Sequence, residues 1–162
     1  MNSLLAWADR LLKWVAGTIV VVLLFTVTAG VVSRALNHPL AWTDEFSGFL
    51  MTWLACLGWM LATRQSAHIR IGVFQDLLPR PAWRATELAI LLAAALLGAV
   101  VAWYSVHLIR TNADIESLAL PISAAWLYVP LLPAGLVTLA QALADLLKVL
   151  RGRAIEMKEV EL

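Results

Sequence analysis

The sequence predicts an all-α membrane protein that forms one domain over residues 1–162, with four transmembrane helices plus amphipathic interfacial helices. The chain is 62% hydrophobic and only 14% charged, whereas a soluble domain is roughly half apolar and about a quarter charged. Four stretches of 18 to 28 residues contain no Asp, Glu, Lys or Arg, and about 20 apolar residues suffice for a helix to cross the hydrocarbon core. The period-two alternation of a membrane barrel strand is absent from these stretches. They are residues 14–33, 46–63, 88–109 and 117–144.

Basic residues are distributed unevenly among the segments that flank the four stretches. Ten of the 12 fall in the amino-terminal segment, the second connection and the carboxyl-terminal tail, whereas the first and third connections have only Arg34 and Arg110. Basic residues in short loops remain on the cytoplasmic side of the membrane. Both termini are therefore predicted to be cytoplasmic, an N-in/C-in topology.

Residues 1–13 are predicted to form an interfacial helix ahead of the first span, at about residues 14–36. At 100° per residue, Trp7 and five leucine or alanine side chains share one arc, while Asp9, Arg10 and Lys13 share the other. Such a helix can lie in the membrane surface with its basic face in water. A simple extension of the first span fits these residues equally well. A cleaved signal peptide is disfavoured, because the first apolar run exceeds the roughly 7–15 residues of a signal sequence.

A short connection leads into the second span, at about residues 43–64. Thr43 is a predicted N-cap, and Asp44 and Glu45 would follow in the first turn, where carboxylates suit the positive end of the helix dipole. Arg34, just before the connection, can pair with one of these acids across the hairpin.

The second span has two unlike faces, and we expect it to contact a partner subunit. One face is an aromatic stripe that continues to Cys56 and Met60. The opposite face is a ridge of small residues that continues to Ala62, and such ridges allow helices to approach closely in lipid. An alternative that stays open is that the stripe faces lipid. The candidate contact residues are Trp42, Phe46, Phe49 and Trp53 in the stripe and Gly48, Thr52, Ala55 and Gly58 in the ridge.

The second half of the chain has two further spans, at about residues 82–110 and 123–149. Residues 66–78 are predicted to form a second interfacial helix ahead of them, because polar and apolar side chains separate onto opposite arcs. In the last span, Pro130 and Pro133 each lack a backbone donor, which predicts a bend or a delayed start of the helix.

The residues give no indication of catalysis. No nucleophile–base pair, phosphate-binding loop or metal-ligand spacing appears in the loops, so we expect neither a cofactor nor an enzyme. No acidic or basic residue lies in the middle of any predicted span, and such residues usually mark ion paths in membrane proteins. A net charge of +1 gives no sign of a nucleic-acid partner. The pattern favours a scaffold or accessory subunit.

Several runs of the sequence resemble one known family. Residues 39–45 (PLAWTDE), 49–53 (FLMTW) and 57–58 (LG), followed by Arg64 and residues 68–71 (HIRI), are similar to the small permease subunit of tripartite ATP-independent periplasmic (TRAP) transporters. The run at residues 117–121 (SLALP), with the later Tyr128, Pro130 and Gly135, is similar to the entry into the last span of that family.

This resemblance implies a non-catalytic subunit of a sodium-coupled, binding-protein-dependent importer of organic acids in the bacterial inner membrane. Its expected partners are the large permease subunit, a periplasmic substrate-binding protein and membrane lipid. Asp114 and Glu116, in the predicted extracytoplasmic loop, are candidates for docking the binding protein. A simple role as solvated loop charges is an open alternative for both.

Two other function classes stay open from the residues alone. The first is a small membrane enzyme that uses His68, His107 or the pair Asp44 and Glu45, although these side chains lie at distant membrane levels. The second is a channel or exporter that assembles from copies of this chain.

Overall fold

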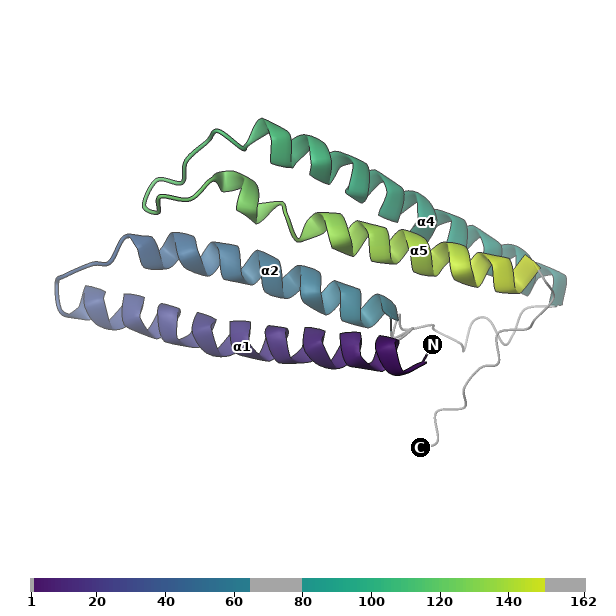
Figure 1. Ribbon diagram of the computed structural model, residues 1–162, viewed down its shortest axis with the longest axis horizontal. Helices are drawn as coiled ribbons and strands as arrows, with labels where there is room; N and C mark the ends of the chain where they lie inside the picture. The colour runs from purple at the N-terminus through teal and green to yellow at the C-terminus, as the bar shows by residue number, and fades with distance from the viewer. Residues whose placement is uncertain (1, 65–79, 151–162) are drawn as a thin grey trace.

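The computed structural model describes residues 2–64 and 80–150, and these fold into four long helices (Figure 1). They are α1 (Asn2–Ala35), α2 (Trp42–Arg64), α4 (Arg80–Thr111) and α5 (Leu131–Leu150), with a 3₁₀ helix, η1 (Ala124–Leu127), ahead of α5. The all-α class is thereby confirmed. Within these described residues, four segments are long and apolar enough to cross a membrane: Ala6–Ala35, Trp42–Arg64, Ala85–Thr111 and Ala124–Leu150. The predicted interfacial helix at residues 66–78 lies outside the described residues.

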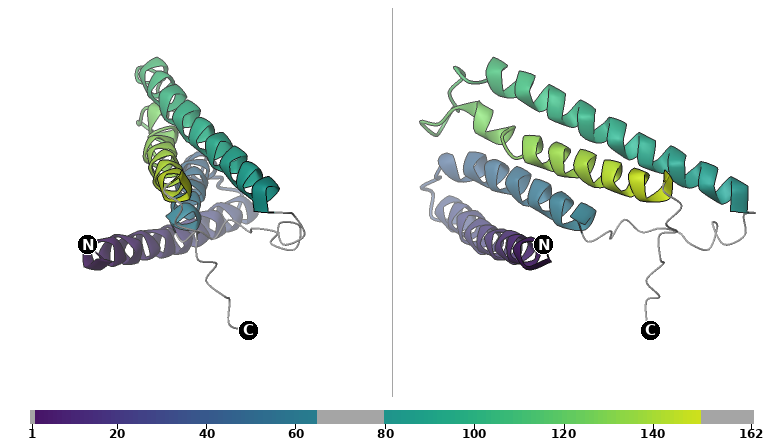
Figure 2. Two further views of the ribbon diagram at one scale, coloured as in Figure 1. Left: turned by 90° about the vertical axis from the view of Figure 1, so that its right-hand side faces the viewer. Right: turned by 45° about the vertical axis from the view of Figure 1, so that its right-hand side comes forward.

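The four helices form an open row in the order α1, α2, α5, α4 (Figures 1 and 2). Helix α1 packs on α2, α2 packs on α5, and α5 packs most extensively on α4. The chain therefore makes two helical hairpins, α1–α2 and α4–α5, and α2 meets α5 where the hairpins join. Helices α1 and α4 lie at opposite edges of the row, so much of their apolar surface faces outward.

Helix α1 is continuous over its 34 residues, which corresponds to about 51 Å at 1.5 Å per residue. The hydrocarbon core is only about 30 Å thick, so one end of α1 must extend beyond it. The sequence left open whether residues 1–13 form a separate surface helix or extend the first span. The unbroken helix has the geometry of an extension, and an interfacial position for these residues stays a prediction.

The turn after α1 explains how the chain reverses so sharply. Asn37 has a φ of 58°, in the left-handed region that asparagine tolerates better than most residues. The His38 amide donates to the Ser33 carbonyl at 2.9 Å, and the Asn37 amide donates to the Arg34 carbonyl at 3.1 Å. This pair of bonds is a Schellman motif, which satisfies the last carbonyl groups of the helix.

Helices α4 and α5 touch through their backbones at two glycines. A Cβ atom added at Gly98 would lie 2.7 Å from the Leu139 amide nitrogen and 2.9 Å from the Gly135 carbonyl oxygen. A Cβ at Gly135 would lie 2.8 Å from the Ala102 amide nitrogen. Small residues permit such close approach, which drives helix association in lipid where the hydrophobic effect cannot. This crossing holds the second hairpin together.

The last span begins late, as the prolines predict. After η1 the chain turns through Tyr128, and α5 starts only at Leu131, directly after Pro130. Pro133 lies in the first turn of α5, where backbone N–H groups have no partner within the helix and the missing donor costs little. Both prolines are thus accommodated without a break inside α5.

Both connections within the hairpins, residues 36–41 and 112–123, lie at the same end of the row (Figure 1). The basic-residue asymmetry predicts that this end is extracytoplasmic. A reporter that is active only in the cytoplasm should therefore be active after Leu162 and silent when inserted near Asn112. The reverse pattern of activity would disprove the N-in/C-in topology.

Candidate subunit interface

The aromatic stripe of α2 faces the interior of this chain. Phe49, Cys56 and Met60 are 6–8% exposed, and Cys56 and Met60 belong to a buried cluster with Leu57 and with Ala134 of α5. Trp42 lies at the end of the stripe, 39% exposed, with its ring 6.2 Å from that of Phe46. Phe49 therefore packs within the subunit and has little surface left for a partner or for lipid.

Trp53 joins the two hairpins. Its ring stacks on Trp126 of η1, with 6.2 Å between centroids and 24° between planes. The indole Nε1 also donates a hydrogen bond to the Trp126 carbonyl oxygen at 3.0 Å. The Trp126 carbonyl oxygen, in the short 3₁₀ helix ahead of α5, thereby gains a hydrogen-bond donor, which matters where water is scarce.

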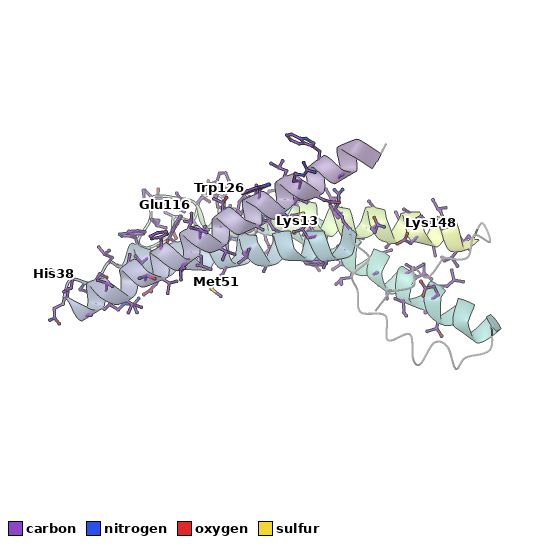
Figure 3. The ribbon with its side chains drawn as sticks, turned by 90° about the horizontal axis from the view of Figure 1, so that it is seen from below. Lys13, His38, Met51, Glu116, Trp126 and Lys148 are labelled. Atoms are coloured by element: carbon purple, nitrogen blue, oxygen red, sulfur yellow. The ribbon has the colours of Figure 1, made fainter. Side chains whose placement is uncertain are left out.

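The small-residue ridge of α2 faces outward instead. Gly48, Ala55 and Gly58 are exposed, and Thr52 is partly exposed. A Cβ atom at Gly48 or Gly58 would meet no atom of this chain within 4 Å. Met51 lies beside them, 61% exposed, and points away from the row (Figure 3). We call Gly48, Met51, Ala55 and Gly58 the outer face of α2.

Arg34 and Asp44 form an ion pair across the first hairpin. Their side chains are 52% and 73% exposed, and such exposed pairs contribute at most about 1 kcal/mol. The pair therefore contributes little to the stability of the fold.

Thr43 does not sit where an N-cap would. Helix α2 already begins at Trp42, and the Thr43 hydroxyl donates to the Leu40 carbonyl oxygen at 2.7 Å rather than accepting from an amide. The side chain is only 1% exposed because it fills the space beside Gly30, where an added Cβ would lie 2.8 Å from the Thr43 hydroxyl oxygen. Its role is close packing of α1 on α2.

Glu45 reaches to the other hairpin. Its two carboxylate oxygens accept hydrogen bonds from the backbone amides of Leu118, at 2.9 Å, and Ala119, at 2.7 Å. The expectation that Glu45 serves mainly its own helix end missed this contact, because the partner groups are backbone amides more than 70 residues away in the chain. Only the folded arrangement brings them together.

The loop between α4 and η1 is organised around Ser123. The Ser123 hydroxyl lies 3.0 Å from the Asn112 carbonyl oxygen and 2.8 Å from that of Ala113, and it accepts from the Ala125 amide. A β-bridge joins Glu116 to Ser123. Asp114 and Glu116 are exposed. A docking role requires this exposure, but charges that are merely solvated would be exposed as well, so the exposure does not distinguish the two alternatives.

At the opposite end of the first hairpin, the Arg64 guanidinium lies 2.7 Å from the Asp9 carboxylate. Both side chains are largely buried, 20% and 31% exposed. Both residues belong to segments predicted to be cytoplasmic, but no ion pair between them was predicted. The pair could have been predicted, because an acid and a base lie at the same membrane level at the open end of one hairpin.

The residues considered for catalysis do not gather into a site in the part of the chain that the structure describes. His107 is exposed on α4, Asp44 pairs with Arg34, and Glu45 binds backbone amides. His68 lies outside the described residues. No group of three potential metal ligands occurs within residues 2–64 and 80–150.

Two curated proteins are similar to part of this chain. The sialic acid TRAP transporter small permease protein SiaQ of Vibrio cholerae is 31% identical over 93 residues, which are 57% of this chain and 53% of that protein. The sialic acid TRAP transporter permease protein SiaT of Haemophilus influenzae is 28% identical over 74 residues, 45% of this chain and 12% of that protein. The match thus spans about half the length of SiaQ and a small part of SiaT.

A family model covers most of the sequence. Residues 23–152 match the DctQ component of tripartite ATP-independent periplasmic transporters, in agreement with the resemblance seen in the residues. This family is a transporter component and not an enzyme. The chain is a multi-pass membrane protein, and it belongs to the DctQ component family of the TRAP transporters.

Proposed function

We propose that this chain is the non-catalytic small subunit of a sodium-coupled TRAP importer of organic acids in the bacterial inner membrane. In this role it scaffolds a large permease subunit and helps to dock a periplasmic substrate-binding protein. The observation that carries the proposal is the outer face of α2, a strip with exposed glycines on a membrane-spanning helix that already packs on its own chain through the other side.

The relatives support a position beside a permease. SiaT, named as a permease protein, has a segment similar to this chain that makes up only 12% of its length. A segment similar to the small subunit within a longer permease protein is expected if the small subunit and the permease work in contact. Sialic acid, the substrate in the names of both relatives, is an organic acid.

Ion and substrate transport are assigned to the large subunit. The stretches 14–33, 46–63, 88–109 and 117–144 carry no charged side chain, and coupling ions are usually bound by ionisable or polar groups near the middle of the membrane. The described helices form an open row, which does not enclose a path between them.

The assembly role is tested by filling the outer face of α2. Replacing Gly48 or Gly58 with leucine should reduce co-purification of the large permease subunit severalfold, because a bulky side chain prevents close helix approach. Neither leucine meets an atom of this chain near its Cβ, so the subunit itself should fold normally. The measurement is the ratio of the two subunits after affinity purification from membranes.

Gly17→Leu provides the matched control, because an added Cβ at Gly17 on α1 also meets no atom within 4 Å. It should leave the subunit ratio unchanged. Wild-type ratios for both α2 variants would exclude the outer face as a tight contact. Purification of the wild type as a homo-oligomer without a permease would instead favour the self-assembling channel.

The docking role is tested through the loop charges. Reversing both Asp114 and Glu116 to lysine should slow association of the binding protein with the assembled complex by roughly tenfold at low salt, because charges at the rim of an interface chiefly set the encounter rate. The difference should shrink as salt screens the charges. Association rates measured on the complex in nanodiscs would detect this, and identical rates at all salt concentrations would exclude a docking role for the two acids.

A further inference from the structure

The extracytoplasmic loop has an apolar tip whose shape is set by another helix. The tip is the run 117–122, between the strand-like pair of Glu116 and Ser123. The Ser117 amide donates to the Ile122 carbonyl oxygen at 2.9 Å, which closes the tip on itself. Glu45 of α2 then binds the next two amides, those of Leu118 and Ala119.

Glu45 is well suited to fix this tip. Its two oxygens each accept one amide of a consecutive pair, so the carboxylate determines both the position and the orientation of that peptide unit. Hydrogen bonds to an ionised acceptor are roughly twice as strong as neutral ones. The loop, which belongs to the second hairpin, is thus also hydrogen-bonded to the first hairpin.

The side chain that this arrangement presents is Leu118, which is fully exposed at 102%. Ile115 on the same loop is 51% exposed. A large apolar side chain held outward on a loop can act as an interface anchor when the partner offers an apolar pocket, and holding it in place before binding lowers the entropic cost of association. The acids Asp114 and Glu116 lie close by in the sequence and are also exposed.

The charge around the tip indicates the kind of partner. Anionic lipid headgroups would be repelled by two exposed carboxylates, whereas a soluble protein with an apolar pocket and a basic rim would complement both the leucine and the acids. We infer that Leu118 is an anchor for the periplasmic binding protein, and that Glu45 is the positioning residue that holds it ready. This inference rests on the proposed function and adds to it a specific contact.

The test uses the complete complex of small and large subunits in nanodiscs and the purified binding protein of the same transporter. Leu118→Ser should raise the Kd for the binding protein by roughly tenfold, mainly through faster dissociation, as expected for loss of an interface anchor. Glu45→Ala should raise the Kd severalfold and should increase hydrogen exchange at the amides of Leu118 and Ala119. Glu45→Gln keeps one acceptor and should fall between Glu45→Ala and the wild type.

The double variant separates positioning from a general structural role. If Glu45 acts by presenting Leu118, then the double variant Glu45→Ala and Leu118→Ser should bind little worse than Leu118→Ser alone, because substitutions at interacting residues do not have additive effects. Leu36→Ser removes another exposed leucine, just after α1, and Asp44→Asn changes the neighbouring acid; both should leave the Kd unchanged. The subunit ratio should be that of the wild type in every variant.

The outcomes distinguish the inference from the proposed function. If the wild-type complex does not form or does not bind the binding protein, the proposed function fails. If the wild type binds and Leu118→Ser binds equally well, then Leu118 is not an anchor and the inference is overturned. Additive losses in the double variant would overturn the positioning role of Glu45.

Discussion

Replacing Gly98 with leucine is expected to abolish stable folding of the subunit. A Cβ at this position would lie 2.7 Å from the Leu139 amide nitrogen and 3.0 Å from the Leu139 Cα atom, both of them backbone atoms that cannot rotate away. Helices α4 and α5 would have to separate along their whole crossing. We therefore expect the leucine variant to be lost from the monodisperse peak in size-exclusion chromatography of detergent-solubilised protein.

Gly98→Ala gives the quantitative version of this prediction. Alanine gains up to about 1 kcal/mol in helix propensity over glycine, yet the overpacked crossing should cost roughly 1–3 kcal/mol. The net effect should be a lower melting temperature of the purified protein. Gly58→Ala is the matched control, because the same change in open space should be neutral or stabilising. Equal melting temperatures for the two alanine variants would show that the crossing is looser than described.

Removal of the Trp53 side chain is expected to loosen one hairpin from the other. Trp53→Ala loses a stacked ring pair, worth about 0.5–1.5 kcal/mol, and a hydrogen bond to the Trp126 carbonyl oxygen worth roughly another 1 kcal/mol. The thermal midpoint should fall by several degrees. Hydrogen exchange at the amides of η1 should rise, while exchange at the crossing of Gly98 and Gly135 should not.

Trp53→Phe divides this loss into its two parts. Phenylalanine retains a ring that can stack on Trp126 but has no N–H donor. Trp53→Phe should therefore lose about half as much stability as Trp53→Ala. If the phenylalanine variant were as unstable as the alanine variant, then the hydrogen bond would carry the whole contribution. If both variants melted like the wild type, Trp53 would not join the hairpins.

The sequence predicts the elements better than their contacts, and the reason is physical. Charge-free stretches identify four spans because the bilayer imposes the same requirement on any chain. Pro130 predicts the late start of α5 because its effect is local. The direction in which each face of α2 points depends on where α5 lies, and periodicity alone separates the faces without saying which one is inside.

The same limit applies to the candidate site. Glu45 was expected at its own helix end, because dipole arguments consider only neighbouring residues. Its partners are amides at Leu118 and Ala119, and amides are present in every sequence and carry no signature. The close contact of Gly98 with Gly135 was also missed, although Gly98 and Ala102 have the small-xxx-small spacing that favours close helix packing. That spacing was the one available signal.

A row that is one helix thick has no inside of its own. The most apolar stretches of its four described spans have only 11–28% of their residues buried within the chain, so much of each helix surface must be covered by lipid or by another protein. The subunit is a single layer of helices with two broad faces. A protein bound along one of these faces would contact helices of both hairpins at once. Rotation of that protein about an axis in the membrane plane would then require the whole layer of helices to rotate with it.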